Sequence, residues 1–256
     1  MRVNLRKTLF ILPNLFTLGS LFCGIYSIFL CLGEPDEDDF YRAAILIVFG
    51  IFFDMTDGRV ARMTRTQSDF GMQIDSLADV VSFGVAPSVL IYRWSLFEAG
   101  AMGVLAAFAY AAAGTLRLAR FNVLSARASD GGAKPGPYTV GLPIPGAAGL
   151  LVSLVVANHA AGGHLEGARA LLMAVLVVLA LLMVSTIRFR SFKDLRLSWR
   201  TAALVLFAVG SSILLAARFR PAFVLVWLLG CYILIGLTEA VWGLARSATR
   251  RRTPPE

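Results

Sequence analysis

Four aspartates, Asp54, Asp57, Asp75 and Asp79, lie in a stretch of the chain whose flanks are strongly apolar. An ionised carboxylate at the centre of a membrane-spanning helix costs roughly 2.5–3.5 kcal/mol on insertion scales, so four would cost on the order of 10 kcal/mol without compensation. A chain that keeps such groups uses them, and a bound divalent metal ion would balance their charge. These aspartates are therefore candidate metal ligands.

The spacing of the aspartates places them in two pairs. Asp54 and Asp57 are three residues apart, and Asp75 and Asp79 are four apart, so each pair lies on one face of a helix. Gly71 falls one turn before Asp75 on the same stripe. Two adjacent helices that each present a carboxylate pair can converge on one site. A site with only oxygen ligands suits Mg²⁺ or Mn²⁺ better than zinc or copper.

The alternative is that these aspartates lie on solvated loops and have no role. The flanking sequence argues against loops. An apolar run over residues 45–53 leads directly into Asp54, and residues 80–92 after Asp79 are also strongly apolar. We therefore expect the cluster to lie at membrane depth.

The stretch from Asp54 to Asp79 reads D-x2-D-G-x2-A-R-x8-G-x3-D-x3-D. This pattern resembles the motif of the CDP-alcohol phosphotransferase family, and every fixed position is filled. Fixed residues at set spacing are far more specific than a lone glycine motif. The resemblance implies joining of a CDP-linked group to an alcohol with release of CMP. It implies that Asp54, Asp57 and Asp75 are metal ligands, and that Asp79 is the general base and also touches a second metal ion.

The resemblance also implies a binding site for a CDP-linked lipid, with CDP-diacylglycerol as one substrate. Small residues would let the cytidine and its phosphates approach the backbone, and Arg62 would contact phosphate. The alternative for Arg62 is that its side chain extends along the helix to the membrane interface. The residues that the resemblance assigns to CDP-lipid binding are Asn14, Thr17, Gly58, Ala61, Arg62 and Gly71.

Segments outside the motif resemble a branch of this family whose acceptor alcohol is L-serine. The carboxylate of serine needs a cation near the site. Candidates on the same side as the motif are Arg117, Arg120 and Lys193, and Asn122 could hydrogen-bond serine. The alternative is that these basic residues only set membrane topology. The segments that carry the resemblance are residues 12–18, 82–87, 117–122, 141–148, 183–185 and 191–193.

Two other functions stay open at this point. Glycerol 3-phosphate or inositol phosphate could use the same cations, which keeps phosphatidylglycerophosphate synthase activity as an alternative within the family. In a different class of protein, a cation transporter could use the aspartates as an ion site. Transport gives no reason for the D-G-x2-A-R segment, so we favour the enzyme.

The composition is that of a polytopic membrane protein. The chain has 256 residues, of which 57% are hydrophobic and 16% charged, and its mean hydropathy is +0.73. This composition leaves no room for a soluble domain, so we expect one transmembrane domain over residues 1–256, with the motif at 54–79 and a basic tail at 246–256. The net charge is +8. Because the basic residues flank apolar runs, we expect them to face an anionic membrane surface or substrate, and we expect no nucleic acid partner.

Apolar runs predict an all-α bundle of about eight transmembrane helices. Cys23, Cys31 and Cys231 lie in or beside these runs and lack metal-ligand spacing, which predicts apolar packing rather than a disulfide framework. The first run lacks a cleavage site of the A-x-A kind after it, so we expect it to be retained. The runs cover residues 14–33, 40–63, 70–95, 99–122, 142–158, 167–187, 199–216 and 221–243.

The distribution of the 24 lysines and arginines predicts the orientation of the bundle. With the N-terminus inside, most of them fall on the inner side, and both termini are cytoplasmic. The aspartate cluster then faces the cytoplasm, which suggests a bacterial inner membrane. The family resemblance implies a homodimer. The basic residues expected on the outer side are Arg42, Arg93, Arg169, Arg218 and Arg220.

Overall fold

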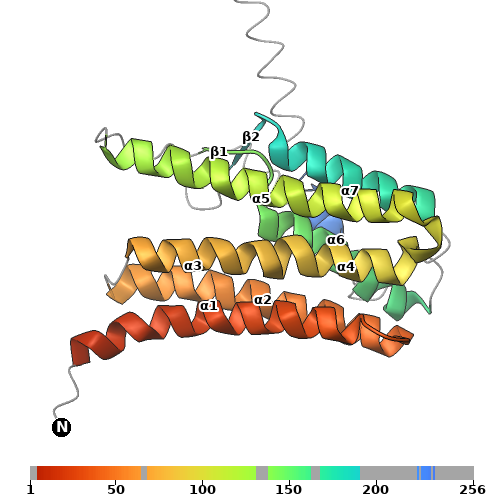
Figure 1. The fold of residues 1–256 in the computed structure, drawn as a ribbon, viewed down its shortest axis with the longest axis horizontal. Helices are drawn as coiled ribbons and strands as arrows, with labels where there is room; N and C mark the ends of the chain where they lie inside the picture. The colour runs from red at the N-terminus through yellow and green to blue at the C-terminus, as the bar shows by residue number, and fades with distance from the viewer. Residues whose placement is uncertain are drawn as a thin grey trace, which may run out of the picture.

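The computed structural model describes residues 5–64, 68–130, 138–162 and 168–190, together with 224, 226–231 and 233. In this part of the chain, long helices run roughly along the longest axis of the molecule (Figure 1). The elements are α1 (Leu5–Leu30), α2 (Glu37–Thr64), α3 (Asp69–Asp79), η1 (Val80–Val85), α4 (Ala86–Ile91), η2 (Tyr92–Leu96), η3 (Phe97–Ala99), α5 (Ala101–Asp130), β1 (Tyr138–Val140), α6 (Ile144–Ala161), α7 (Arg169–Val184) and β2 (Arg188–Arg190).

Each of the first six apolar runs overlaps a helix or a continuous helical segment, but α1 begins nine residues before its run and α5 ends eight residues after its run. Within the described residues, four helical segments are long and apolar enough to cross a membrane: Pro13–Leu30, Phe70–Ala99, Ala101–Ala126 and Ile144–Ala161. The helix α2 is also long, with 28 residues, but it carries the charged residues of the motif. With 16 residues, α7 is shorter than these spans. The predicted runs at 199–216 and 221–243 lie wholly or largely outside the described residues, so the total of eight stays a prediction.

The helix that begins at α3 continues through η1, α4, η2 and η3 without leaving the helical region. It changes its hydrogen-bond pattern on the way, because η1 and η2 are π-helical and η3 is a 3₁₀ turn. Gly100, with φ of 59°, ends this helix, and α5 then runs back along the bundle (Figure 1). A positive φ suits glycine because it lacks a Cβ atom.

The core of the bundle lies where η1, α4 and α6 meet α2, α5 and α7. Its largest fully buried side chains include Ile47, Phe83, Tyr110, Leu151 and Leu176. Large apolar side chains also cover the outer faces of α1 and α5. Their exposure fits helices whose outer faces meet lipid tails, which are as apolar as leucine. Examples are Leu15, Phe22, Phe29, Leu105 and Phe108.

Acidic residues and ion pairs gather at the end of the bundle where α1 joins α2 and α6 approaches α7. This end lies opposite the end of α2 that carries the motif (Figure 1). The His159 ring stacks on Tyr41, with 4.4 Å between ring centroids. His159 is therefore far from the aspartate cluster. The ion pairs at this end join Asp38 to His159, Asp39 to Arg42 and Glu98 to Arg169.

A short antiparallel pair of strands, which lie before α6 and after α7 in the chain, is an element that the sequence did not predict. Its strands β1 and β2 pair Tyr138 with Arg190 and Val140 with Arg188. Each strand has only three residues, so a period-2 pattern cannot show in the sequence. Apart from these two strands, the regular elements of the described residues are helices, which agrees with the predicted helical class.

Candidate active site

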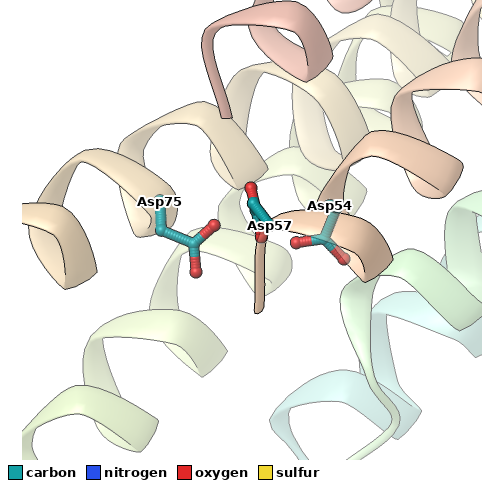
Figure 2. A group of neighbouring side chains, drawn as sticks. All are labelled: Asp54, Asp57 and Asp75. Atoms are coloured by element: carbon teal, nitrogen blue, oxygen red, sulfur yellow. The ribbon is translucent and has the colours of Figure 1, made fainter. Parts of the chain in front are cut away.

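The aspartate cluster forms where the C-terminal part of α2 lies beside α3. Oxygen atoms of Asp54, Asp57 and Asp75 all lie within 4.8 Å of one another. Figure 2 shows the three carboxylates directed toward a common point, with Asp54 and Asp57 on one helix and Asp75 on the other. Asp57 is 5% exposed, and the other two are half-buried. The structure thus brings together three of the four predicted metal ligands.

Asp79 lies one turn beyond Asp75, at the last position of α3. Its carboxyl group lies beside that of Asp54. The fourth aspartate of the motif therefore joins the same cluster, at its edge, where α3 changes into the π-helical segment η1. This position leaves Asp79 beside the three clustered ligands.

Thr17 on α1 holds one of the carboxylates in place. Its hydroxyl donates a hydrogen bond to Asp57, with 2.8 Å between Oγ1 and Oδ2. Both side chains are buried. Because a buried carboxylate needs partners, this bond fixes which oxygen of Asp57 stays free for a ligand. Thr17, which the resemblance assigns to lipid binding, therefore contacts the metal-ligand cluster directly.

The N-terminus of α3 is built around Gly71. The Ser68 hydroxyl caps this helix by accepting a hydrogen bond from the Gly71 amide, at 3.0 Å. A Cβ atom on Gly71 would lie 3.1 Å from Ser68 Oγ and 3.4 Å from Asn14 Oδ1. A larger residue here would crowd the Ser68 cap and contact Asn14 of α1. Asn14 and Gly71, both predicted lipid-binding residues, lie together.

The cluster fits a divalent metal ion. Its ligands are carboxylate oxygens, which Mg²⁺ and Mn²⁺ prefer. In the part of the chain that the structure describes, the ion pairs lie at the opposite end of the bundle, and neither Asp57 nor Asp75 pairs with a basic residue. The partner found for Asp57 is the neutral Thr17 hydroxyl. A divalent cation bound among these three carboxylates would offset their mutual repulsion and stabilise their ionised form.

Beside the cluster, α2 offers space for a bulky group. A Cβ atom on Gly58 would meet only the Arg62 guanidinium, at 3.6 Å from Nη1. Arg62 is exposed, and Ala61 is half-buried on the same turn. The absence of a side chain at Gly58 and the exposed guanidinium of Arg62 together leave room for a negatively charged group next to the carboxylates. The predicted phosphate-binding residues therefore surround one open part of α2.

The predicted acceptor residues lie in different surroundings. Arg117 on α5 is buried, with 7% exposure. Five residues further along this helix, the Asn122 amide donates a hydrogen bond to the Ser76 hydroxyl, at 2.9 Å between Nδ2 and Oγ. Ser76 follows Asp75, so this bond links α5 to the helix that carries two of the aspartates. Lys193 lies outside the described residues.

Arg120 binds backbone carbonyls at the end of α7. Its guanidinium donates hydrogen bonds to the carbonyls of Val184 at 2.8 Å, Ser185 at 3.0 Å and Met183 at 3.2 Å. A weaker bond of 3.4 Å reaches Val140 in β1. The last carbonyls of a helix have no partner within that helix, so Arg120 satisfies them. In this structure Arg120 thus joins α5, α7 and β1.

Gly141 allows the residue after β1 to pack closely against the end of α7. Its φ is 80°, and a Cβ atom there would lie 2.3 Å from the Met183 carbonyl oxygen and 2.9 Å from Arg120 Nη2. Its amide donates to the Ile187 carbonyl at 2.8 Å. Any other residue at this position would push the end of β1 away from α7.

We expect Arg120→Ala to lower the thermal stability of the protein strongly. Hydrogen bonds to a charged group contribute about 1.5–3 kcal/mol each, and this change removes several at once. The measurement is thermal unfolding in detergent, followed by tryptophan fluorescence. Arg42→Ala, which removes an exposed pair at the other end of the bundle, is the control and should leave the melting temperature almost unchanged. If Arg120→Ala melted like wild type but raised the KM for the acceptor, the acceptor role would be favoured instead.

Ser68 and Ser76 are site residues that sequence reasoning did not single out. The sequence does contain one signal for Ser68, since serine before a helix is a preferred cap. For Ser76 there was no signal, because its partner Asn122 is far away in the sequence. Contacts of this kind come from tertiary packing alone.

Comparison with known proteins identifies the family. The family model for CDP-alcohol phosphatidyltransferase matches residues 10–183. A Helicobacter pylori protein named CDP-diacylglycerol–serine O-phosphatidyltransferase is 38% identical over 238 residues, covering 91% of this chain and 92% of the relative. Proteins of the same name from Bacillus subtilis and Methanocaldococcus jannaschii are 34% identical over 183 residues and 37% over 149. These matches cover 71% and 58% of this chain, and 91% and 64% of those relatives.

The family match includes all four aspartates and the two motif glycines, and it runs from within α1 almost to the end of α7. It therefore covers the part of the chain in which α1, α2 and α3 build the carboxylate cluster. The apolar helices and the match together make the chain an integral membrane enzyme. The chain belongs to the CDP-alcohol phosphatidyltransferase family.

Proposed function

We propose that this protein transfers the phosphatidyl group of CDP-diacylglycerol to the hydroxyl of L-serine, which gives phosphatidylserine and CMP. The observation that carries the reaction class is the cluster of Asp54, Asp57 and Asp75, with Asp79 at its edge, at the meeting of α2 and α3. The support for serine as the acceptor is the name of the Helicobacter pylori relative, whose match spans 91% of this chain.

In the proposed reaction, Asp79 accepts the proton of the serine hydroxyl. The hydroxyl oxygen forms a bond to the phosphorus that carries diacylglycerol. The bond from this phosphorus to the oxygen shared with the CMP phosphate breaks, and CMP leaves with that electron pair. A positioned carboxylate can perform such a proton transfer, and its contribution is typically 10²–10⁴-fold in rate.

We propose that Asp54, Asp57 and Asp75 hold a divalent ion, Mg²⁺ or Mn²⁺, and that Asp79 also contacts a second one. A bound divalent ion would neutralise charge that develops on the leaving phosphate. Thr17 keeps the Asp57 carboxylate oriented through their hydrogen bond. We place the pyrophosphate over the open part of α2, between Gly58 and Arg62, because that part has a cation and no side chain in the way.

The experiment that tests this function measures lipid products of the purified protein in detergent. CDP-diacylglycerol and a divalent metal are offered with L-serine, glycerol 3-phosphate or inositol phosphate in separate reactions. We expect phosphatidylserine with serine, and no lipid product with the other two. Product only with glycerol 3-phosphate would leave the family reaction in place but show that serine is not the acceptor. Removal of metal with a chelator should stop the reaction, and readdition should restore it.

We propose that the aspartate cluster faces the cytoplasm, in the inner membrane of a bacterium. Acidic residues gather at the other end of the bundle, and basic residues such as Arg62 lie at the motif end. A cysteine placed at Ser68 should react with a membrane-impermeant maleimide only in inverted vesicles, and one at Gly33 only in right-side-out vesicles. The reverse pattern would invert the topology.

The family resemblance also leads us to propose a homodimer. Light scattering in detergent, corrected for bound detergent, should then give twice the chain mass of 27.6 kDa. A protein mass equal to one chain would contradict it.

A further inference from the structure

The helix that carries Asp75 and Asp79 changes its register directly after Asp79. In η1, the Ala86 amide donates to the Val81 carbonyl, five residues back instead of four. Such π-helical turns are rare, and they are less stable than α-helix unless other contacts hold them. One extra residue in a turn rotates the following helix by about 100° relative to the preceding one. The register of η1 therefore decides how the aspartates are turned relative to the core-facing residues of α4.

Proline contributes to this irregular segment. Pro87 has no amide hydrogen, so the carbonyl four residues earlier, that of Phe83, loses the donor that an α-helix would give it. A buried carbonyl without a donor costs free energy, so another group must bond to it. Phe83 is fully buried.

That donor comes from α5. The Tyr110 hydroxyl donates a hydrogen bond to the Phe83 carbonyl, at 3.2 Å. Tyr110 has no exposed surface. Since both groups are shielded from water, neither has water as an alternative partner. The bond therefore ties the middle of η1 to a helix that is separate in sequence by 27 residues.

On its other side, η1 is tied to α1. The Ser82 hydroxyl donates to the Ser20 carbonyl at 3.0 Å, and Ser82 is fully buried. A Cβ atom on Gly24 would lie only 2.7 Å from the Ser82 Cα atom, so α1 and η1 are in close backbone contact. The segment is thus held between α1 and α5 by one hydroxyl bond on each side.

We infer that Tyr110 and Ser82 are positioning residues for the reaction. By fixing the π-helical register of η1, they set the direction in which Asp79 faces the clustered carboxylates. Neither residue touches the cluster in the contacts described above, so they act through the helix backbone. This inference rests on the proposed role of Asp79 as the base. A displacement of a reacting group by about 1 Å can cost up to 10²-fold in rate, which makes such positioning measurable.

The test uses the full-length protein in detergent with the variants Tyr110→Phe and Ser82→Ala. Each removes one hydroxyl and leaves the remaining side chain in place. We expect kcat for phosphatidylserine formation to fall about tenfold in each variant. KM for CDP-diacylglycerol and for L-serine should stay within about twofold, because the residues that bind substrates are unchanged. Thermal unfolding is measured on the same samples.

Two variants serve as matched controls. Tyr26→Phe removes the hydroxyl of a tyrosine on the exposed face of α1, and Ser153→Ala removes a buried hydroxyl that bonds within α6, to the Leu150 carbonyl at 2.7 Å. Both should keep the kcat of wild type. A general loss of stability would lower activity in step with the melting temperature, whereas positioning lowers kcat in folded protein.

A kcat within twofold of wild type in folded Tyr110→Phe would overturn the inference. So would equal changes in kcat and KM. If Tyr110→Phe does not fold, Ser82→Ala decides: a lower kcat with unchanged KM supports the inference, and an unchanged kcat overturns it. Failure of the proposed function looks different, since wild type would then form no phosphatidylserine, or Asp79→Asn would turn over normally.

Discussion

The Asp79→Asn variant should bind CDP-diacylglycerol almost as well as wild type and yet lose turnover by about 10²-fold or more. Asparagine keeps the size of the side chain but cannot accept the proton of the serine hydroxyl, and general base catalysis is typically worth 10²–10⁴-fold. Asp79 lies at the edge of the cluster, at the last position of α3. The measurements are steady-state phosphatidylserine formation and equilibrium binding of CDP-diacylglycerol.

Asp38→Asn is the matched control for this prediction. Asp38 is exposed at the opposite end of the bundle, where it pairs with His159. The same chemical change there should leave turnover unchanged. Turnover of Asp79→Asn within about threefold of wild type would remove Asp79 as the base. Loss of CDP-diacylglycerol binding together with turnover would instead point to a ligand role for Asp79.

The second large effect is expected for Asp57→Ala, which should weaken metal and CDP-diacylglycerol binding together. Asp57 is the most buried of the three clustered ligands, and its carboxylate faces those of Asp54 and Asp75 (Figure 2). We expect the Mg²⁺ or Mn²⁺ concentration for half-maximal activity to rise by at least about tenfold, which corresponds to about 1.4 kcal/mol. Titration of activity with metal, and of CDP-diacylglycerol binding at fixed metal, measures both effects.

Glu34→Ala provides the control, because it removes an exposed carboxylate from the turn between α1 and α2. Its metal titration should match that of wild type. The metal concentration for half-maximal activity of Thr17→Ala should lie between those of Glu34→Ala and Asp57→Ala. This change removes the hydroxyl that orients Asp57 but leaves the carboxylate itself. An unchanged metal titration in Asp57→Ala would exclude Asp57 as a ligand.

The helices and the carboxylate cluster could be predicted from the sequence because their signals are local. Apolar runs of spanning length are visible without any knowledge of packing, and each of the first six runs overlaps a helical segment between α1 and α7. Spacings of three and four residues place Asp54 with Asp57, and Asp75 with Asp79, on single helix faces. The convergence of α2 and α3 on one site was a prediction from the paired carboxylates, and the distances confirm it for Asp54, Asp57 and Asp75.

The contacts of Arg120 could not be predicted from local signals in the sequence. A basic residue at a helix end is compatible with substrate binding, topology or capping, and the sequence does not distinguish them. The structure shows Arg120 bonded to carbonyls that lie 20 to 65 residues away in the sequence. Whether it also contacts the acceptor stays a prediction. The pairing of β1 with β2 was missed for a related reason, since strands of three residues carry no periodic signal.

The sequence by itself determined the membrane class, the main helices and the residue types of the site. Hydrophobicity and helical periodicity act over short stretches, so a single chain already contains them. Only the tertiary structure decided which hydroxyl orients Asp57, which tyrosine bonds to the Phe83 carbonyl and where α3 changes register. These depend on partners on other helices, such as Thr17 and Tyr110, which are distant in sequence and meet only after packing.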